Sequence, residues 1–334
     1  MLEPYVEPIL DIKISDHQSP WILDYDHQEV GNPLGYMIEA QCLRKTIYDY
    51  AIAFNNIEWC APHQLRTLER TPDFVKAVLD DGREIKASLC VAADGRNSQL
   101  RKEAGIKITQ WTYPQTAIVC QIEHDKPHHG RAYEHFLPRG PFAVLPMQGQ
   151  RSSIVWTEKK DIAGTFLDLP DDRFNQELQK RFGDDLGEMR VLGQRWSYPL
   201  GVLIAQDYID RRLALVGDAA HVIHPVAGQG LNMGFRDIAA LAEVILDAQH
   251  LGLDIGSVTA LERYQRWRRF DNIMLMAVTD GMVRLFSNHS KSLKLFRGLG
   301  LGLINRLPPA KRFLMKHAMG LVGELPRSIA GKPL

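Results

Sequence analysis

The chain has 334 residues, of which 45% are hydrophobic and 24% charged, and its 40 basic residues balance 40 acidic ones. This composition is typical of a globular protein with a large core, and the zero formal net charge gives no global field that would attract nucleic acid. The four cysteines are widely spaced and form no CxxC pair, which argues against a structural zinc site or a disulfide scaffold and favours the reducing cytoplasm. The first residues do not have the pattern of a secretion signal, and no apolar run approaches the roughly 18 residues of a membrane span.

The N-terminal region is predicted to begin in sheet and to continue into a helix. Residues 8–16 and 21–26 alternate apolar and polar side chains around a turn, which is typical of an antiparallel hairpin. A helix is predicted over roughly residues 39–54, because apolar residues there recur at helical spacing. The apolar face of this helix would comprise Leu43, Ile47, Tyr50 and Phe54.

The remaining elements alternate between two kinds of sheet. Leu89–Ala93 form a continuous apolar run, the mark of a strand buried on both faces, whereas residues 115–158 hold several strand-like runs that predict a separate antiparallel sheet. A polar helix is expected at 171–182, a strand near 188–200 and a short buried strand at Leu213–Val216, after which the chain is predicted to be helical. The two sheets are therefore interleaved in sequence.

The most informative segment begins where the strand Leu213–Val216 ends. The strand delivers Gly217 and Asp218 to its carboxyl end, where open α/β sheets bind ligands. Asp218 can accept hydrogen bonds from a ribose or ribityl hydroxyl, and Gly217 permits close approach to the backbone. A turn-rich loop then opens a helix predicted over Leu231–Leu246, with Asn232 in its first turn and free N–H groups that favour an electron-rich ligand. A glycine-rich helix start without a ligand is the alternative.

A second strand end carries similar chemistry. The run Leu89–Ala93 stops at Asp94 and Gly95, and the residues from Arg96 to Arg101 begin a short helix. A carboxylate, a flexible glycine and basic groups thus meet at one strand end. Taken alone, the segment is better explained as a strand-to-helix turn with a capping Asp.

Together these segments resemble one known family. GDAAHVIHPVAGQGLNMGFRD, residues 217–237, is similar to the second FAD motif of class A flavoprotein aromatic monooxygenases, most closely the ubiquinone-biosynthesis hydroxylases of the 2-polyprenyl-6-methoxyphenol hydroxylase type. VAADGRNSQLRKEAGI, residues 91–106, resembles the DG motif of the same family, which is associated with FAD and with the passage of NAD(P)H. YMIEAQCLRKTIYDYA, residues 36–51, resembles the family helix that carries an Arg or Gln near the cofactor ribose and phosphates.

The resemblance implies roles for individual residues. The residues implied to bind FAD are Gln41, Arg44, Asp94, Gly95, Gly217, Asp218, Pro225, Gly228, Gln229, Gly230, Leu231 and Asn232. GPFAVLPM and WSYPL resemble segments on the substrate side of the flavin, and they nominate Leu145, Pro146, Tyr198 and Pro199. These four residues are equally compatible with core positions. The sequence names no catalytic side chain and no metal ligand.

The resemblance also implies a fold and its division into domains. The expected class is α/β, with a Rossmann-like FAD/NAD(P)-binding domain interleaved with an antiparallel-sheet substrate domain and followed by a helical C-terminus. The FAD-binding domain is predicted over residues 36–110 and 200–270, and the substrate domain over 1–35 and 111–199. The helical region is predicted over 271–334.

The implied activity is hydroxylation of a polyprenylated phenol in ubiquinone biosynthesis. FAD, reduced by NAD(P)H, would activate O2 for transfer of one oxygen atom to the ring, so that the cofactor supplies the difficult chemistry and no side-chain nucleophile is required. The expected partners are the aromatic substrate, O2 and other ubiquinone-biosynthesis proteins, with no nucleic acid. Between Gly281 and Gly323 the chain has eight Lys and Arg residues and no acidic ones, interleaved with apolar residues. This pattern predicts peripheral contact with the inner face of a membrane, and a helical cap or subunit contact is the alternative.

Two further patterns limit the interpretation. The family begins with a strand, a GxGxxG loop and a helix, and no such unit is found here, since the glycines at 298, 300 and 302 follow no strand. A non-catalytic accessory protein and a longer natural chain are therefore alternatives.

The other pattern consists of histidines. His124, His128, His129 and His135 are predicted to lie in a solvated loop and not to form a metal site. His221 and His224 are expected either to pack in the core or to assist a phenolic substrate.

Overall fold

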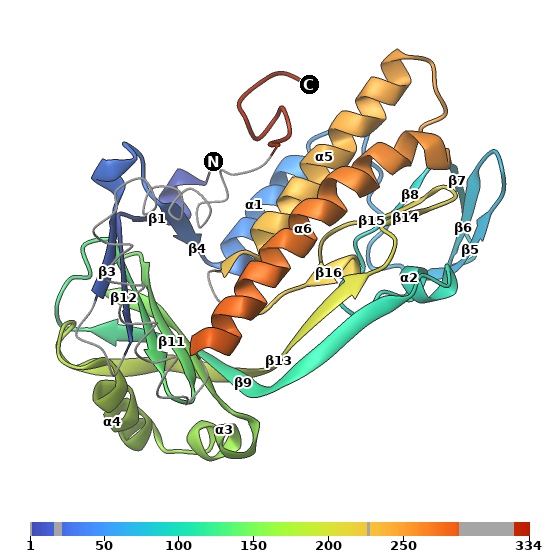
Figure 1. Ribbon diagram of the computed structural model, residues 1–334. Coiled ribbons are helices and arrows are strands. Elements are labelled where there is room, and N and C mark those ends of the chain that lie inside the picture. The colour runs from blue at the N-terminus through green and yellow to red at the C-terminus, as the bar shows by residue number, and fades with distance from the viewer. Residues whose placement is uncertain (1, 17–21, 226–227, 287–323) are drawn as a thin grey trace. The chain divides into compact units, whose positions relative to one another are not determined.

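The computed structural model describes residues 2–16, 22–225, 228–286 and 324–334 (Figure 1). The chain forms two compact units, each assembled from separate stretches of sequence. The first unit comprises Met1–Ile57, Tyr113–Leu200 and Gly281–Met319, and the second comprises Glu58–Thr112, Gly201–Asp280 and Gly320–Leu334. The prediction that two sheets are interleaved in the sequence is therefore confirmed.

A mostly antiparallel sheet of eight strands dominates the first unit, and its longest strands continue into the second. The strand order is β16-β13-β9-β12-β11-β10-β2-β3. The bounds are β2 (Asp11–Asp16), β3 (Ile22–Asp26), β9 (Ile108–His124), β10 (Arg131–Leu137), β11 (Gly140–Met147), β12 (Arg151–Lys159), β13 (Met189–Ala205) and β16 (His221–Val222). The predicted N-terminal hairpin is present as the antiparallel pair β2 and β3, whereas β10 pairs with β2 in parallel.

Two helices cover one face of this sheet because their apolar stripes match the apolar side of the strands. Helix α3 (Lys160–Leu167) is followed by α4 (Asp171–Phe182), whose bounds are those predicted for the polar helix. Phe174, Leu178 and Phe182 recur at helical spacing on α4 and are buried against sheet residues that include Trp156. The ring centroids of Trp156 and Phe174 lie 5.5 Å apart.

The rest of the first unit holds the predicted N-terminal helix. Strand β1 (Val6–Ile9) pairs with β4 (Gly35–Ile38), and short 3-10 turns, η1 (Glu3–Tyr5) and η2 (His27–Glu29), flank them. Helix α1 (Ala40–Ala51) is shorter than predicted, and its expected apolar face is largely open, with Ile47, Tyr50 and the following Phe54 exposed. Amphipathic spacing identified the helix correctly, but not what covers it.

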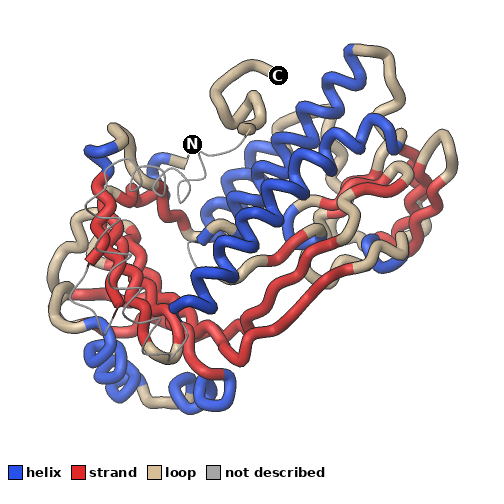
Figure 2. Tube along the Cα trace, viewed as in Figure 1, coloured by secondary structure: helices blue, strands red, loops and turns tan. Residues whose placement is uncertain are grey.

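The second unit contains two small sheets and the main helices. The sheets have the strand orders β14-β15-β8 and β5-β6-β7. The strand bounds are β5 (Leu65–Arg70), β6 (Val75–Leu79), β7 (Glu84–Ala87), β8 (Cys90–Ala92), β14 (Ile209–Asp210) and β15 (Leu213–Leu215). The helix and turn bounds are α2 (Gln99–Glu103), η3 (Gly217–Ala219), α5 (Gly230–His250) and α6 (Val258–Phe286). Helices α5 and α6 run side by side (Figure 2) and enclose, with β15, a core centred on Leu215, Leu241 and Tyr264.

Several predicted boundaries need correction. The short strand Leu213–Leu215 is fully buried as expected, but Val91 in β8 is 44% exposed, so the strand there is not buried on both faces. Helix α5 extends to His250 instead of Leu246, because Val244 and Ala248 continue its buried stripe. Residues 324–334 form turns where helix was expected. No helix among the described residues is long and apolar enough to cross a membrane.

Candidate cofactor site

The two strand-end motifs emerge at the same edge of one parallel pair of strands. Strand β15 runs parallel to β8 with Leu215 opposite Ala92, and the Val216 N–H donates to the Ala92 carbonyl at 3.0 Å. Asp94 and Asp218 therefore follow neighbouring strands at their carboxyl ends. In open α/β sheets this edge is where ligands bind.

The turn η3, which follows β15, presents Asp218 to the outside. Gly217 has φ +57°, a left-handed conformation that favours glycine. Helix α5 approaches closely here, since a Cβ on Gly234 would lie 3.4 Å from the Gly217 Cα. Asp218 itself is exposed, and no described residue is hydrogen-bonded or ion-paired to its carboxylate. Among the described residues, the turn thus holds an acceptor without a partner at the strand end.

The DG motif has a structural role that favours the capping interpretation for its aspartate. One Asp94 carboxylate oxygen accepts the backbone N–H groups of Gln99 at 2.9 Å and Leu100 at 3.2 Å, at the start of α2. Asp94 therefore orders the turn after β8, and its predicted role towards FAD stays a prediction. Gly95, with φ +78°, supplies the left-handed residue that the turn requires.

Arg101, which the sequence showed only as one basic group of a short helix, joins the two motifs. Its side chain is 2% exposed, and burial lowers the pKa of its guanidinium. Nη1 donates to the Ala219 carbonyl at 2.6 Å and Nη2 to the Arg96 carbonyl at 3.0 Å. The cation is thus satisfied by backbone carbonyls and ties α2 to the turn that carries Asp218. Only tertiary structure reveals this contact.

The N-terminus of α5 is open towards a ligand. The helix begins at Gly230 without a side-chain cap, so no described side chain occupies the N–H groups of its first turn. Gln229 is buried, and its side-chain oxygen accepts from the Asn232 amide at 3.3 Å. Leu231 is exposed, and the Gly228 N–H donates to the Pro225 carbonyl at 2.9 Å. Residues 226 and 227 lie outside the described part of the chain.

This donor set fits FAD. The exposed Asp218 carboxylate, which no described residue pairs with, suits ribityl or ribose hydroxyls, and the uncapped end of α5 suits the electron-rich edge of the flavin ring. Gly217 and Gly234 face each other, so the absence of side chains there lets α5 pack closely on the turn that carries Asp218. The part of the predicted site that lies in the second unit is therefore assembled, while its role in binding stays a prediction.

The other predicted site residues belong to the first unit. Gln41 and Arg44 are exposed on α1, where the Gln41 amide donates to the Glu39 carboxylate at 3.0 Å. The predicted substrate residues divide by exposure. Leu145 and Pro146 lie in β11 and are largely buried, while Tyr198 and Pro199 lie in β13 and are exposed. Their roles towards FAD and substrate stay predictions.

The histidines need a correction. His124 and His128 do not lie in a solvated loop but are buried, and their ring nitrogens are hydrogen-bonded. His124 contacts the Ser152 hydroxyl at 3.0 Å, and His128 contacts the Met147 carbonyl at 2.7 Å. His224 is also buried, which lowers its pKa to about 4 and keeps the imidazole neutral. These side chains have packing roles, which neither spacing nor composition could reveal.

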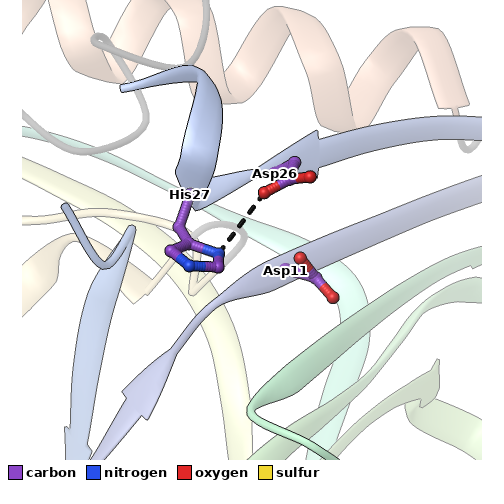
Figure 3. Close-up of side chains that lie close together, drawn as sticks. All are labelled: Asp11, Asp26 and His27. Carbon is purple, nitrogen blue, oxygen red and sulfur yellow. Dashed lines mark ion pairs between the residues drawn. The ribbon is translucent and has the colours of Figure 1, made fainter. Parts of the chain in front are cut away.

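One group of metal-ligating side chains is explained by ordinary bonds (Figure 3). His27 Nδ1 lies 3.3 Å from Asp26 Oδ1, and the same carboxylate oxygen accepts a hydrogen bond from the Gln28 N–H. Asp11 pairs with the Arg131 guanidinium at 3.1 Å. These contacts satisfy both carboxylates without a metal ion. A second group, formed by His63, Asp80 and Asp81, lies on the surface, where His63 is close enough to pair with both carboxylates.

Comparison with known proteins identifies the family. Residues 24–269 match the FAD binding domain family. Ubiquinone hydroxylase UbiL of Rhodospirillum rubrum is 50% identical over 98% of this chain and 77% of its own length, and 3-demethoxyubiquinol 3-hydroxylase of Escherichia coli is 34% identical over 89% and 76%. The crystal structure of p-nitrophenol 4-monooxygenase PnpA from Pseudomonas putida shares the fold, with a TM-score of 0.77 and 18% identity over 95% of this chain and 82% of its own. The chain therefore belongs to the FAD-dependent aromatic monooxygenases, within the group that contains the ubiquinone-biosynthesis hydroxylases.

Proposed function

We propose that this protein is an FAD-dependent hydroxylase of ubiquinone biosynthesis that oxidises a polyprenylated phenol with NAD(P)H and O2. The observation that carries the proposal is the 50% identity to a ubiquinone hydroxylase. It is supported by an exposed Asp218 carboxylate that has no partner among the described residues and by an α5 N-terminus without a side-chain cap. The identity extends over 98% of this chain, so it covers both units.

The residues of the chain bind and orient, and the cofactor supplies the redox chemistry. When bound, FAD would supply the redox chemistry that links NAD(P)H and O2 to hydroxylation of an electron-rich ring. Asp218 accepts hydrogen bonds from the hydroxyls of the cofactor, and the first-turn N–H groups of α5 stabilise negative charge on the flavin ring. Leu145 and Pro146, on β11, provide apolar surface suited to an aromatic substrate and to exclusion of water.

Direct assay tests this function. The purified protein, in its full natural length, should retain a flavin absorption band through desalting and oxidise NAD(P)H faster when a polyprenylphenol is added. Mass spectrometry should then find a product heavier by one oxygen atom. NAD(P)H oxidation that yields only hydrogen peroxide with every phenol tested would contradict hydroxylation. Asp218→Ala should weaken FAD binding, and unchanged binding would contradict the role of that residue.

The same proposal places the enzyme at the cytoplasmic face of a membrane, where a polyprenylated substrate would reside. The support is the sequence between Gly281 and Gly323, rich in Lys and Arg and free of acidic residues, most of which lies outside the described residues. Co-flotation with vesicles that contain anionic lipid tests this membrane association. Flotation should be lost in roughly 0.5 M salt, because salt screens the charges. Equal flotation with neutral vesicles would contradict the electrostatic part, and co-purification of tagged protein tests a complex with other ubiquinone-biosynthesis proteins.

A further inference from the structure

A buried ionic network lies behind the turn that carries Asp218. Its centre is Asp237 on α5, which is 0% exposed. One carboxylate oxygen accepts the backbone N–H of Gly217 at 3.1 Å and His221 Nε2 at 2.5 Å. The other accepts Arg268 Nε at 2.9 Å and the Asn272 amide at 3.2 Å. All four acceptor positions of the carboxylate are therefore used.

The charges of this network keep Asp237 ionised. Burial alone would raise the pKa of Asp237, but His221 and Arg268 hold it below the ordinary value. Arg268 is 1% exposed, and its remaining nitrogens donate to the Asp271 carboxylate at 2.8 Å and the Asn272 oxygen at 2.9 Å. The guanidinium is thus bonded to two side chains of α6, Asp271 and Asn272, which fix its position, and it fixes Asp237 on α5 in turn.

Only one bond of Asp237 reaches the backbone of the turn, and that bond goes to Gly217. The carboxylate of the next residue, Asp218, is exposed and forms no hydrogen bond or ion pair with a described residue, so the direction in which this side chain points depends on the backbone of the turn. The far end of the same turn is held by Arg101 through the Ala219 carbonyl. The Asp237 carboxylate is therefore bonded to the first residue of a three-residue turn, and the Arg101 guanidinium is bonded to the last. Buried ion pairs can often be replaced by apolar residues without loss of stability, so positional specificity, not stability, is the advantage to test for this network.

We infer that Asp237 is a positioning residue for FAD: through the Gly217 N–H it holds the turn so that Asp218 is preorganised to receive the cofactor hydroxyls. The inference rests on the proposed function only in that FAD is the ligand. Asp237 does not touch the cofactor in this scheme. Arg268 and His221 contribute by fixing Asp237.

Asp237→Asn is a sharp test because it keeps the shape of the side chain. Both carboxylate oxygens face donors only, so either orientation of the amide sets an NH2 group against another donor. In protein of full natural length, the FAD dissociation constant, measured by flavin fluorescence, should rise at least tenfold. Hydrogen exchange of the Gly217–Ala219 amides in the FAD-free protein should become faster.

A matched control separates positioning from loss of stability. Asp254 also accepts a glycine N–H, from Gly256 at 3.0 Å, and pairs with a buried arginine, Arg212, at the opposite end of β15. Asp254→Asn should lower the melting temperature while FAD affinity stays within threefold of wild type. Exchange at Gly217–Ala219 should not change in this variant.

A double-mutant cycle tests whether the effect passes through Asp218. In an Asp218→Ala background, Asp237→Asn should change FAD affinity by less than threefold, because the oriented carboxylate is already gone. An equal effect in both backgrounds, or less than a threefold effect in wild type, would overturn the inference. If Asp237→Asn does not fold, Arg268→Lys, which keeps the charge but supplies fewer donors, is judged by the same criteria.

The outcomes are distinguishable from those for the proposed function, because FAD binding is measured without turnover. Protein that binds FAD but hydroxylates no polyprenylphenol would refute the function and leave the inference standing. Active enzyme in which Asp237→Asn binds FAD normally would refute the inference alone.

Discussion

Glu134 provides a quantitative test of the electrostatics of the first unit. It lies in β10, opposite Ala143 of β11 and Ile14 of β2, so both cross-strand neighbours are apolar. No ion pair or hydrogen bond to its carboxylate is found among the described residues, and burial raises its pKa from 4.5 to about 7. The perturbation is Glu134→Gln, which keeps the size and removes the charge.

The sign and size follow from proton linkage. The folded protein holds the Glu134 proton more tightly than the unfolded chain, so stability falls as the pH rises from 4.5 through about 7. A shift of 2.5 units, 7 minus 4.5, corresponds to about 3 kcal/mol, and partial exposure reduces this to about 1–3 kcal/mol. Glu134→Gln should therefore be more stable than wild type by that amount at pH 8 and nearly equal at pH 5.

The assay is urea unfolding at both pH values, with the denaturant dependence of the free energy compared between variants. Glu177→Gln is the matched control, because hydrogen bonds from Lys180 and Arg181 lower the pKa of Glu177. That variant should be less stable than wild type at pH 8, the opposite sign. A stability difference for Glu134→Gln that is the same at pH 5 and pH 8 would refute the reasoning.

Three other predictions concern stability. Burial lowers the pKa of His224 from 6.5 to about 4, so the free energy of unfolding should fall by up to about 3 kcal/mol as the pH falls from 6.5 to 4, because only the unfolded chain binds the proton there. Urea unfolding of His224→Gln should lack this part of the pH dependence, and an unchanged dependence would contradict the prediction. In Gly256→Ala the new Cβ would lie 2.2 Å from the Ser88 carbonyl oxygen, so the melting temperature should fall strongly. In Gly164→Ala, in α3, the new Cβ meets nothing within 4 Å, so this variant should be neutral or more stable by about 0.5–1 kcal/mol. Equal melting temperatures for the two variants would refute the argument. Leu178→Ala should lose about 2–5 kcal/mol of unfolding free energy, because Leu178 is fully buried on α4, and a loss below about 1 kcal/mol would show that this site is not tightly packed.

Local pattern was sufficient for much of the fold. The bounds of α4 followed from its apolar spacing, and the β2 and β3 hairpin from the alternation of apolar and polar residues around a turn. Long-range packing determined the rest. Val91 belongs to an apolar run yet is exposed, and the polar ring of His128 is buried, because burial depends on which segments the fold brings alongside.

The cofactor site divides in the same way. The sequence by itself determined that Gly217 and Asp218 follow a buried strand, that a long helix starts shortly after them, and that the motif is one of FAD-dependent hydroxylases. Only the tertiary structure brought Arg101 to Ala219 and Asp237 to Gly217, across 118 and 20 positions of the chain. Motifs are local because a turn and a helix start are local, whereas the charges that hold the turn in place come from elements that meet only when the chain packs.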